Sequence, residues 1–170
     1  MAGMVHQLIN IMKEQTERQT ELYGLSLEEK EAIVKNDIEQ LQNLLGLKNM
    51  VLSQTHRLEK QRIALVEDIA DVTGNKKDDI ALSDVIEILK DKPEEQEELR
   101  EVGNALRESV EKLKEINEVN KSLIESSLEF VEYSLNALRS TIAPEPVEYP
   151  TLKKPLADEN GGAGTYNTTG

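Results

Sequence analysis

Apolar residues recur along most of this chain at alternating steps of three and four positions, the period of a helix with one apolar face. This pattern predicts a first helix from Val5 to about Val34, which ends near Lys35 and Asn36. Its seam combines apolar and amide positions, namely Val5, Leu8, Met12, Gln15, Gln19 and Leu22. No segment shows the apolar and polar alternation of a strand, so the predicted fold class is all-α.

A second helix is predicted from Asp37 to Gly74. Asp37 with Gln40 three residues later is typical of a helix N-cap, and glycine is the usual residue just beyond a helix C-terminus. The predicted seam of this helix consists of Leu41, Leu44, Met50 or Val51, Leu58, Leu65, Ile69 and Val72. Gly24 and Gly46 lie inside the first two helices, where each costs about 1 kcal/mol relative to Ala. We therefore expect a kink, a break or a close helix approach at both glycines.

After a polar connection, Leu82, Val85, Ile86 and Leu89 predict a short helix, with Ser83 as one candidate for its cap. Pro93 suits the first turn of a last helix, which the pattern carries to about Thr141. Such a helix has about 45 to 50 residues and is roughly 70 Å long at ~1.5 Å per residue. A helix of that length needs other long helices beside it. The prediction is an elongated antiparallel bundle of three long helices plus one short helix.

Two asparagines interrupt the apolar seam of the last helix. The seam consists of Leu106, Val110, Leu113, Asn117, Asn120, Ile124, Ser127, Val131 and Leu138. Asn117 and Asn120 can form a structural polar layer that fixes helix register at some cost in stability. Alternatively, both amides face a partner or a cavity and bind its backbone groups.

Beyond Ala143 the composition changes, since four prolines follow within a short distance and Gly161, Gly162 and Gly164 come after them. Proline and glycine at this density are typical of a flexible segment. The predicted organisation is a helical-bundle domain at 1–142 and a flexible tail at 143–170.

Composition narrows the classes of function. A formal net charge of −13, with one Phe, four Tyr and no Trp, argues against binding to nucleic acid, which needs cationic and aromatic side chains. The absence of Cys excludes disulfides and thiolate chemistry. Because the N-terminal residues lack the basic and apolar regions of a signal peptide, and no apolar run is long enough for a membrane span, we expect a cytoplasmic protein without stable membrane insertion.

The motifs of catalysis are missing from the sequence. It contains no phosphate-binding loop, dinucleotide fingerprint, serine elbow or zinc-protease helix motif. His56 and Glu59 have the spacing of one di-iron half-site, but the second half-site is absent, which favours a surface histidine. The acidic run at 94–101 is typical of a solvated helix start rather than of a cation site. We expect no enzymatic activity, no cofactor and no metal.

One segment of the last helix has a distinctive pattern, since 114–124 (KEINEVNKSLI) contains two asparagines three apart and is followed by Leu128, Phe130 and Val131. This segment resembles the C-terminal helix of the FlgN-type flagellar chaperones. Earlier segments match the first two helices of the family in the same order: 29–33 (EKEAI), 36–38 (NDI) with Leu41, and 57–59 (RLE) with Arg62. The resemblance extends over about residues 5 to 142.

The resemblance implies a cytoplasmic chaperone of type III flagellar export. Such chaperones bind the hook-associated junction proteins FlgK and FlgL, prevent their premature assembly and deliver them to the export gate, whose component FlhA is a further expected partner. The partner-binding residues implied on the last helix are Leu128, Phe130, Val131, Tyr133, Leu135 and Leu138. Tyr166 resembles a tail tyrosine that some relatives use for docking at the export gate.

Two alternatives remain open at this point. Each apolar position of the last helix can equally be an ordinary core residue. The chain can also be a structural coiled-coil scaffold or a homo-oligomeric adaptor, such as a homodimer, without a role in export.

Overall fold

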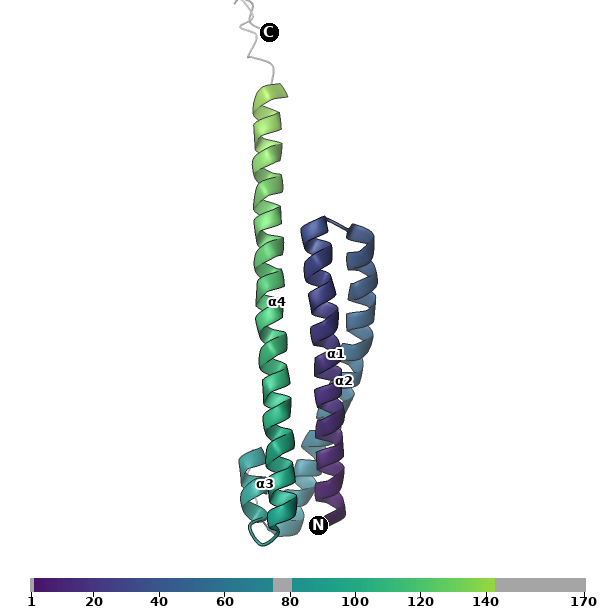
Figure 1. Cartoon of the computed structure of the whole chain (residues 1–170), viewed down its shortest axis with the longest axis vertical. Helices are drawn as coiled ribbons and strands as arrows, with labels where there is room; N and C mark the ends of the chain where they lie inside the picture. Colours follow the sequence, from purple (N-terminus) through teal and green to yellow (C-terminus); the bar gives the residue numbers. More distant parts are fainter. Residues whose placement is uncertain (1, 75–80, 143–170) are drawn as a thin grey trace, which may run out of the picture. The chain divides into compact units, whose positions relative to one another are not determined.

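The computed structural model describes residues 2–74 and 81–142, which form four helices (Figure 1). The helices are α1 (Ala2–Lys35), α2 (Ile38–Thr73), α3 (Leu82–Ile88) and α4 (Pro93–Ile142). No strand occurs in these residues, so the predicted fold, a bundle of three long helices and one short helix, is confirmed. The predicted tail at 143–170 lies outside the described residues.

The chain divides into two compact units, Met1–Tyr133 and Ser134–Gly170. The first unit contains α1, α2, α3 and most of α4, and it holds the whole hydrophobic core cluster. The predicted domain boundary after residue 142 stays a prediction.

The turn between α1 and α2 forms as the sequence predicts. Asn36 adopts a left-handed conformation with φ 54°, which ends α1 after Lys35. The Asp37 carboxylate then accepts a hydrogen bond from the Gln40 N–H at 3.0 Å and caps α2. This connection of two residues reverses the chain, so α1 and α2 lie side by side as a hairpin (Figure 1).

Two other predicted boundaries are also confirmed, whereas the predicted cap of α3 is wrong. Gly74 ends α2 in a left-handed conformation with φ 72°, and Pro93 is the first residue of α4. Ser83 lies inside α3, because that helix begins at Leu82. Its start is stabilised by the Asp84 carboxylate, which accepts a hydrogen bond from the Ala81 N–H at 3.0 Å.

Of the features expected at the two helical glycines, a break and a close helix approach are both wrong. Gly24 and Gly46 lie in uninterrupted helices, and a Cβ at either position would meet nothing within 4 Å. The close approach is instead at Gly103 in α4, where a Cβ would lie 2.8 Å from Cδ2 of Leu82. A Cβ at Gly103 would therefore require the Leu82 side chain to shift where α3 packs on α4.

All four helices meet in one core near the N-terminal end of α1. This cluster consists of Val5, Leu8, Ile9 and Met12 of α1, Val66 and Ile69 of α2, Val85 and Leu89 of α3, and Leu99 and Val102 of α4. In the seam predicted for α2, Val72 is wrong, since it is 62% exposed, and of the two alternatives Met50 and Val51 it is Val51 that is buried. Burying these apolar side chains is the main stabilising contribution at this end of the bundle.

Candidate functional site

Polar contacts fix how the long helices run in the first unit. Gln15 of α1 donates to Glu59 of α2 at 2.8 Å, and Lys48 of α2 forms an ion pair with Glu29 of α1 at 2.7 Å. Later residues of α1 therefore meet earlier residues of α2, which makes these two helices antiparallel.

Helix α4 instead runs parallel to α1. Lys13 forms an ion pair with Glu98 at 2.8 Å, and further along both helices Ser26 donates through Oγ to Asn117 at 3.0 Å. Ser26 and Asn117 are 91 residues apart in the sequence, and the next contact, between Glu29 and Asn120, has the same separation. The same offset places Lys35, the last residue of α1, level with Ser126 of α4.

The two asparagines of α4 occupy different environments. Asn120 is 3% exposed, and its Nδ2 donates to the Ser26 carbonyl oxygen and to Glu29 Oε2, both at 2.8 Å. Asn117 is exposed and accepts only the hydroxyl of Ser26. Both amides thus hold α4 to α1, but only Asn120 is a buried polar group.

Glu29 links this contact to α2, because its carboxylate also accepts a hydrogen bond from Lys48. The Glu29 and Lys48 side chains are 19% and 15% exposed, so this ion pair is less screened by water than the other pairs on the surface. We refer to Ser26, Glu29, Lys48 and Asn120 as the polar clasp. The sequence analysis assigned a structural role only to Asn120 of this group, because nothing in the sequence pattern joins Ser26, Glu29 or Lys48 to it.

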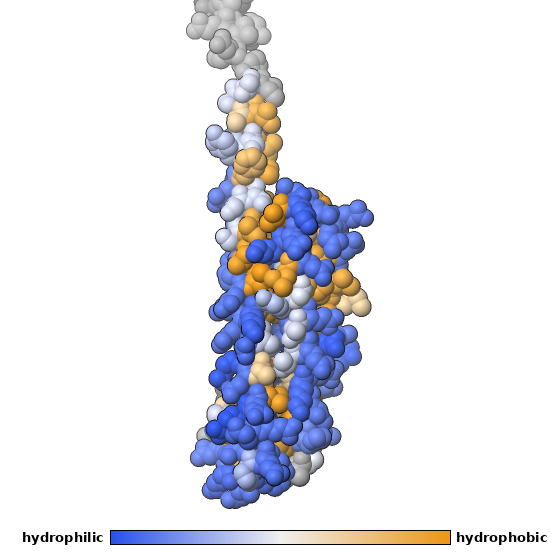
Figure 2. Space-filling model, in the orientation of Figure 1, coloured by the Kyte–Doolittle hydropathy of each residue, from blue (hydrophilic) through white to orange (hydrophobic). Residues whose placement is uncertain are grey.

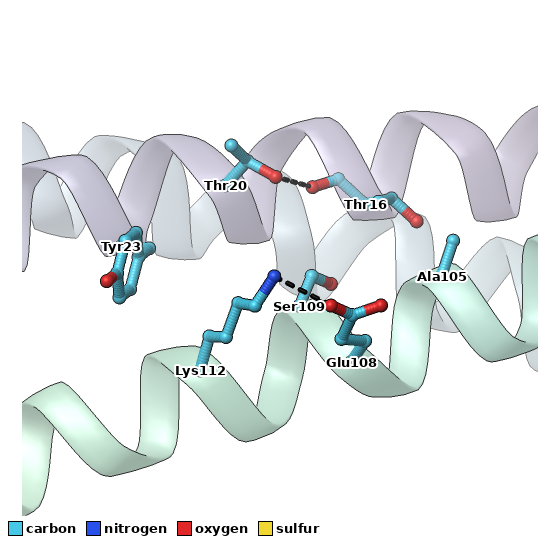
Figure 3. A pocket seen from close by; sticks show the side chains of 7 residues that line it. All are labelled: Thr16, Thr20, Tyr23, Ala105, Glu108, Ser109 and Lys112. Atoms are coloured by element: carbon cyan, nitrogen blue, oxygen red, sulfur yellow. Dashed lines mark hydrogen bonds and ion pairs between the residues drawn. The ribbon is translucent and has the colours of Figure 1, made fainter.

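A hollow lies between α1 and α4 (Figure 3). Along both helices its lining residues come between those of the hydrophobic core and those of the polar clasp. The hollow has a volume of about 320 Å³ and is lined by Thr16, Thr20 and Tyr23 of α1 and by Ala105, Glu108, Ser109 and Lys112 of α4. Ion pairing with Lys112 at 2.7 Å, through a hydrogen bond and its charge, lowers the pKa of the Glu108 carboxyl and raises the pKa of Lys112. Both groups are therefore charged at neutral pH and are poorly suited to transferring protons.

The metal site considered at His56 does not form around Glu59. That carboxylate accepts hydrogen bonds from Arg62 at 2.8 and 2.7 Å and from Gln15. In the described part of the chain, no three His, Cys, Asp or Glu side chains are grouped so that they could hold a metal ion.

The residues predicted to bind a partner are all exposed. In the first unit the exposed fractions are 60% for Leu128, 71% for Phe130, 50% for Val131 and 74% for Tyr133. In the second unit Leu135 and Leu138 are 47% and 56% exposed. None of the six is a core position in this structure, whereas Leu99, Val102 and Ile116 are the buried apolar residues of α4. Tyr166 lies outside the described residues.

The apolar stripe of α4 consists, in the first unit, of Ile124, Leu128 and Val131. It continues the seam of α4 that includes the buried Ile116 and Asn120, the latter hydrogen-bonded to α1, but Ile124 is already 44% exposed. For Leu128 and Val131 the reason for exposure is the register, since α1 ends level with Ser126 and offers no side chains beyond it. Figure 2 shows hydrophobic residues gathered on the visible face around the end of α1, whereas the other end of the bundle is mostly hydrophilic.

Comparison with known proteins identifies the family. The model of the FlgN protein family matches residues 1–150. The chain belongs to the FlgN family. Neither the curated proteins nor the solved structures include a significant match.

Membership of the FlgN family gives the chain a role as a flagellar export chaperone. The match includes the polar clasp and the whole apolar stripe of α4, so both belong to the part of the chain that the family shares. No helix of this FlgN-family chain, within its described residues, is long and apolar enough to cross a membrane.

Proposed function

We propose that this FlgN-family chain binds the hook-associated junction proteins FlgK and FlgL in the cytoplasm, keeps them from assembling prematurely and delivers them to the flagellar export gate. It acts by binding alone, without a catalytic step, cofactor or metal. The gate component FlhA is the second partner in this proposal, with Tyr166 as a docking residue.

The exposed apolar stripe of α4 is the observation that carries this proposal. Ile124, Leu128 and Val131 follow one another at steps of four and three, so they lie on one face of the helix. Each is at least 44% exposed, although large apolar residues are stabilised by burial. Because α1 ends beside the stripe, a helix from another protein can lie where α1 stops and cover it.

This mode of recognition is helix-in-groove binding, in which an amphipathic helix places its apolar face against apolar side chains of a receptor. A junction protein whose assembling helix is covered in this way cannot present the same helix to the growing filament. Binding therefore accounts for both protection and delivery without any chemical reaction. Phe130 and Tyr133, on other faces of α4, would extend the contact around the helix.

The test is titration calorimetry of the chain with the C-terminal region of FlgK or FlgL. The variant Leu128→Gln with Val131→Gln should weaken binding at least tenfold, because two apolar side chains leave the contact. The same two substitutions at Leu45 and Leu52 of α2 form a matched control, since these leucines are 56% and 48% exposed. The control variant should bind like the wild type.

Circular dichroism separates binding from folding. All four positions are exposed, so both double variants should keep the helical signal of the wild type. Loss of that signal in the α4 variant would mean that Leu128 and Val131 are core residues. Absence of a complex between the wild-type chain and either junction protein would refute the proposed function.

A homo-oligomeric scaffold is the second candidate, because an exposed apolar stripe also suits self-association. Light scattering distinguishes it. A fixed oligomer that the α4 variant dissolves, together with no binding to FlgK or FlgL, would favour the scaffold.

A further inference from the structure

We propose that the stripe of α4 selects a partner helix whose apolar face is bordered by lysine or arginine. This inference rests on the proposed function in one respect only, namely that the stripe binds another protein. It adds the chemistry by which one amphipathic helix is chosen over another.

The structural basis is a row of glutamates beside the apolar stripe. Glu125, Glu129 and Glu132 each follow a stripe residue directly, so they repeat the same steps of four and three. Successive residues of a helix are about 100° apart, and the row therefore lies along one edge of the stripe. We refer to these three residues as the glutamate row.

The glutamate row has no cation of its own. All three side chains are exposed, and within the described residues none forms an ion pair or a side-chain hydrogen bond. Lys121 is the last cation of α4 in the first unit, and no Lys or Arg occurs between it and Tyr133. From α1, Lys35 comes level with this region, but it is paired with Glu31 at 3.4 Å.

Several other surface glutamates have a cation beside them, since Glu108 is paired with Lys112, Glu98 with Lys13 and Glu59 with Arg62. Others, such as Glu97, Glu101 and Glu111, are exposed and unpaired among the described residues, like the glutamate row. The glutamate row differs from these in lying directly beside an exposed apolar stripe, in a stretch of α4 without Lys or Arg. It attracts a helix with cations along its apolar face and repels one with anions there.

The same argument disfavours a second copy of this chain as the occupant. Two copies that paired through their stripes would bring six carboxylates to one short interface without any cation between Lys121 and Tyr133 to offset them. A partner with basic flanks removes this repulsion and adds ion pairs at the rim of the contact, where they set specificity and association rate.

The experiment uses three synthetic amphipathic peptides of about three heptads, with identical Leu and Ile stripes. The residues that border the stripe are all Lys, all Gln or all Glu. Calorimetry with the full chain should give the tightest binding for the Lys peptide, about tenfold tighter than for the Gln peptide, and the weakest for the Glu peptide. Raising the salt from about 0.1 M to about 1 M shortens the screening length from ~10 Å to ~3 Å and should remove most of this preference.

The deciding variant is Glu125→Gln with Glu129→Gln and Glu132→Gln, which removes three charges and keeps the side-chain shapes. Its matched control is Glu97→Gln with Glu101→Gln and Glu111→Gln, three exposed residues elsewhere on α4. The first variant should bind the Lys and Gln peptides equally well, while the control keeps the preference of the wild type. Equal binding of all three peptides to the wild-type chain, or an unchanged preference in the first variant, would overturn the inference.

Binding to junction proteins distinguishes this inference from the proposed function. If FlgK or FlgL binds the wild type and the first variant equally at low salt, the charge selection is wrong and the proposed function stands. If neither junction protein binds but the Lys peptide is preferred, the proposed function fails and the charge selection stands. Self-association that strengthens in the first variant would identify a second copy as the occupant and overturn the inference.

Discussion

The sharpest prediction concerns Asn120, the one buried amide of α4. Replacing it by Ala removes two hydrogen bonds, one to the Ser26 carbonyl oxygen and one to the Glu29 carboxylate, both at 2.8 Å. A neutral hydrogen bond contributes about 1 kcal/mol and one to a charged group about 1.5–3 kcal/mol. The gross loss is therefore about 2.5–4 kcal/mol.

One feature of the site reduces this loss. Oδ1 of Asn120 is buried and accepts no hydrogen bond from any described residue. Removing such an atom recovers part of its desolvation cost, which is about 1 kcal/mol or more. Glu29 also keeps its ion pair with Lys48 in the variant. The net expectation for Asn120→Ala is a decrease of about 2 kcal/mol in the free energy of unfolding.

Asn117→Ala is the matched control. Asn117 has the same side chain, lies three residues away and contacts the same Ser26, but it is exposed and accepts one neutral hydrogen bond. The Ser26 hydroxyl that donates this bond is buried, so water does not simply replace the bond, and the expected decrease is about 1 kcal/mol, half of that for Asn120→Ala. Urea denaturation followed by circular dichroism measures both values, provided that unfolding is two-state. Equal effects of the two substitutions, or an Asn120→Ala effect within about 0.5 kcal/mol of zero, would refute the assignment of Asn120 as the buried anchor.

Two further predictions test local packing and charge. Gly24→Ala and Gly46→Ala should each raise the free energy of unfolding by about 0.5–1 kcal/mol, since both sites have space for a Cβ in a regular helix. Gly103→Ala should not raise it, because its Cβ would lie 2.8 Å from Leu82. Urea denaturation measures all three variants, and an equal gain at the three sites would contradict this packing. The pKa of Glu59 is lowered from 4.5, first by the hydrogen bond from Arg62 and then by the Gln15 bond and the Arg62 charge, with desolvation opposing them. Since the folded pKa is below the unfolded one, this contribution to stability is complete above pH 4.5 and is lost as the pH falls through the folded value. Glu59→Gln should therefore destabilise the protein most at neutral pH and progressively less below pH 4.5, as urea denaturation at several pH values would show, and an effect that does not vary with pH would contradict this assignment.

The helices were predictable because their signals are local. The Asp37 cap with Gln40, the left-handed Gly74 and the first-turn Pro93 each act within one turn of helix, and the structure has all three as predicted. The cap of α3 was mispredicted because Ser83 and Asp84 are adjacent, and sequence alone does not show which of the two meets the helix start.

Contacts between helices were less predictable. Gly103 looked no different from Gly24 or Gly46, since only the packing of Leu82 against α4 makes a Cβ costly there. Likewise, Ser26, Glu29 and Lys48 carry no sequence signal that joins them to Asn120. Such contacts depend on the register between helices, which the residues of any single helix do not determine.

The exposed stripe of α4 follows from the same register. The apolar seam of α4 extends through Val131, while α1 ends level with Ser126. Nothing in the sequence of α4 marks the point where the seam changes from core to surface. Sequence patterns alone therefore did not decide whether the apolar residues after Asn120 belong to the core or bind a partner. Once the polar clasp sets the offset between α1 and α4, it also determines which apolar residues have no partner within the first unit. The buried amide therefore acts on binding indirectly: a variant that loosens the clasp should alter the position of the stripe relative to α1, and with it the surface that a partner helix meets.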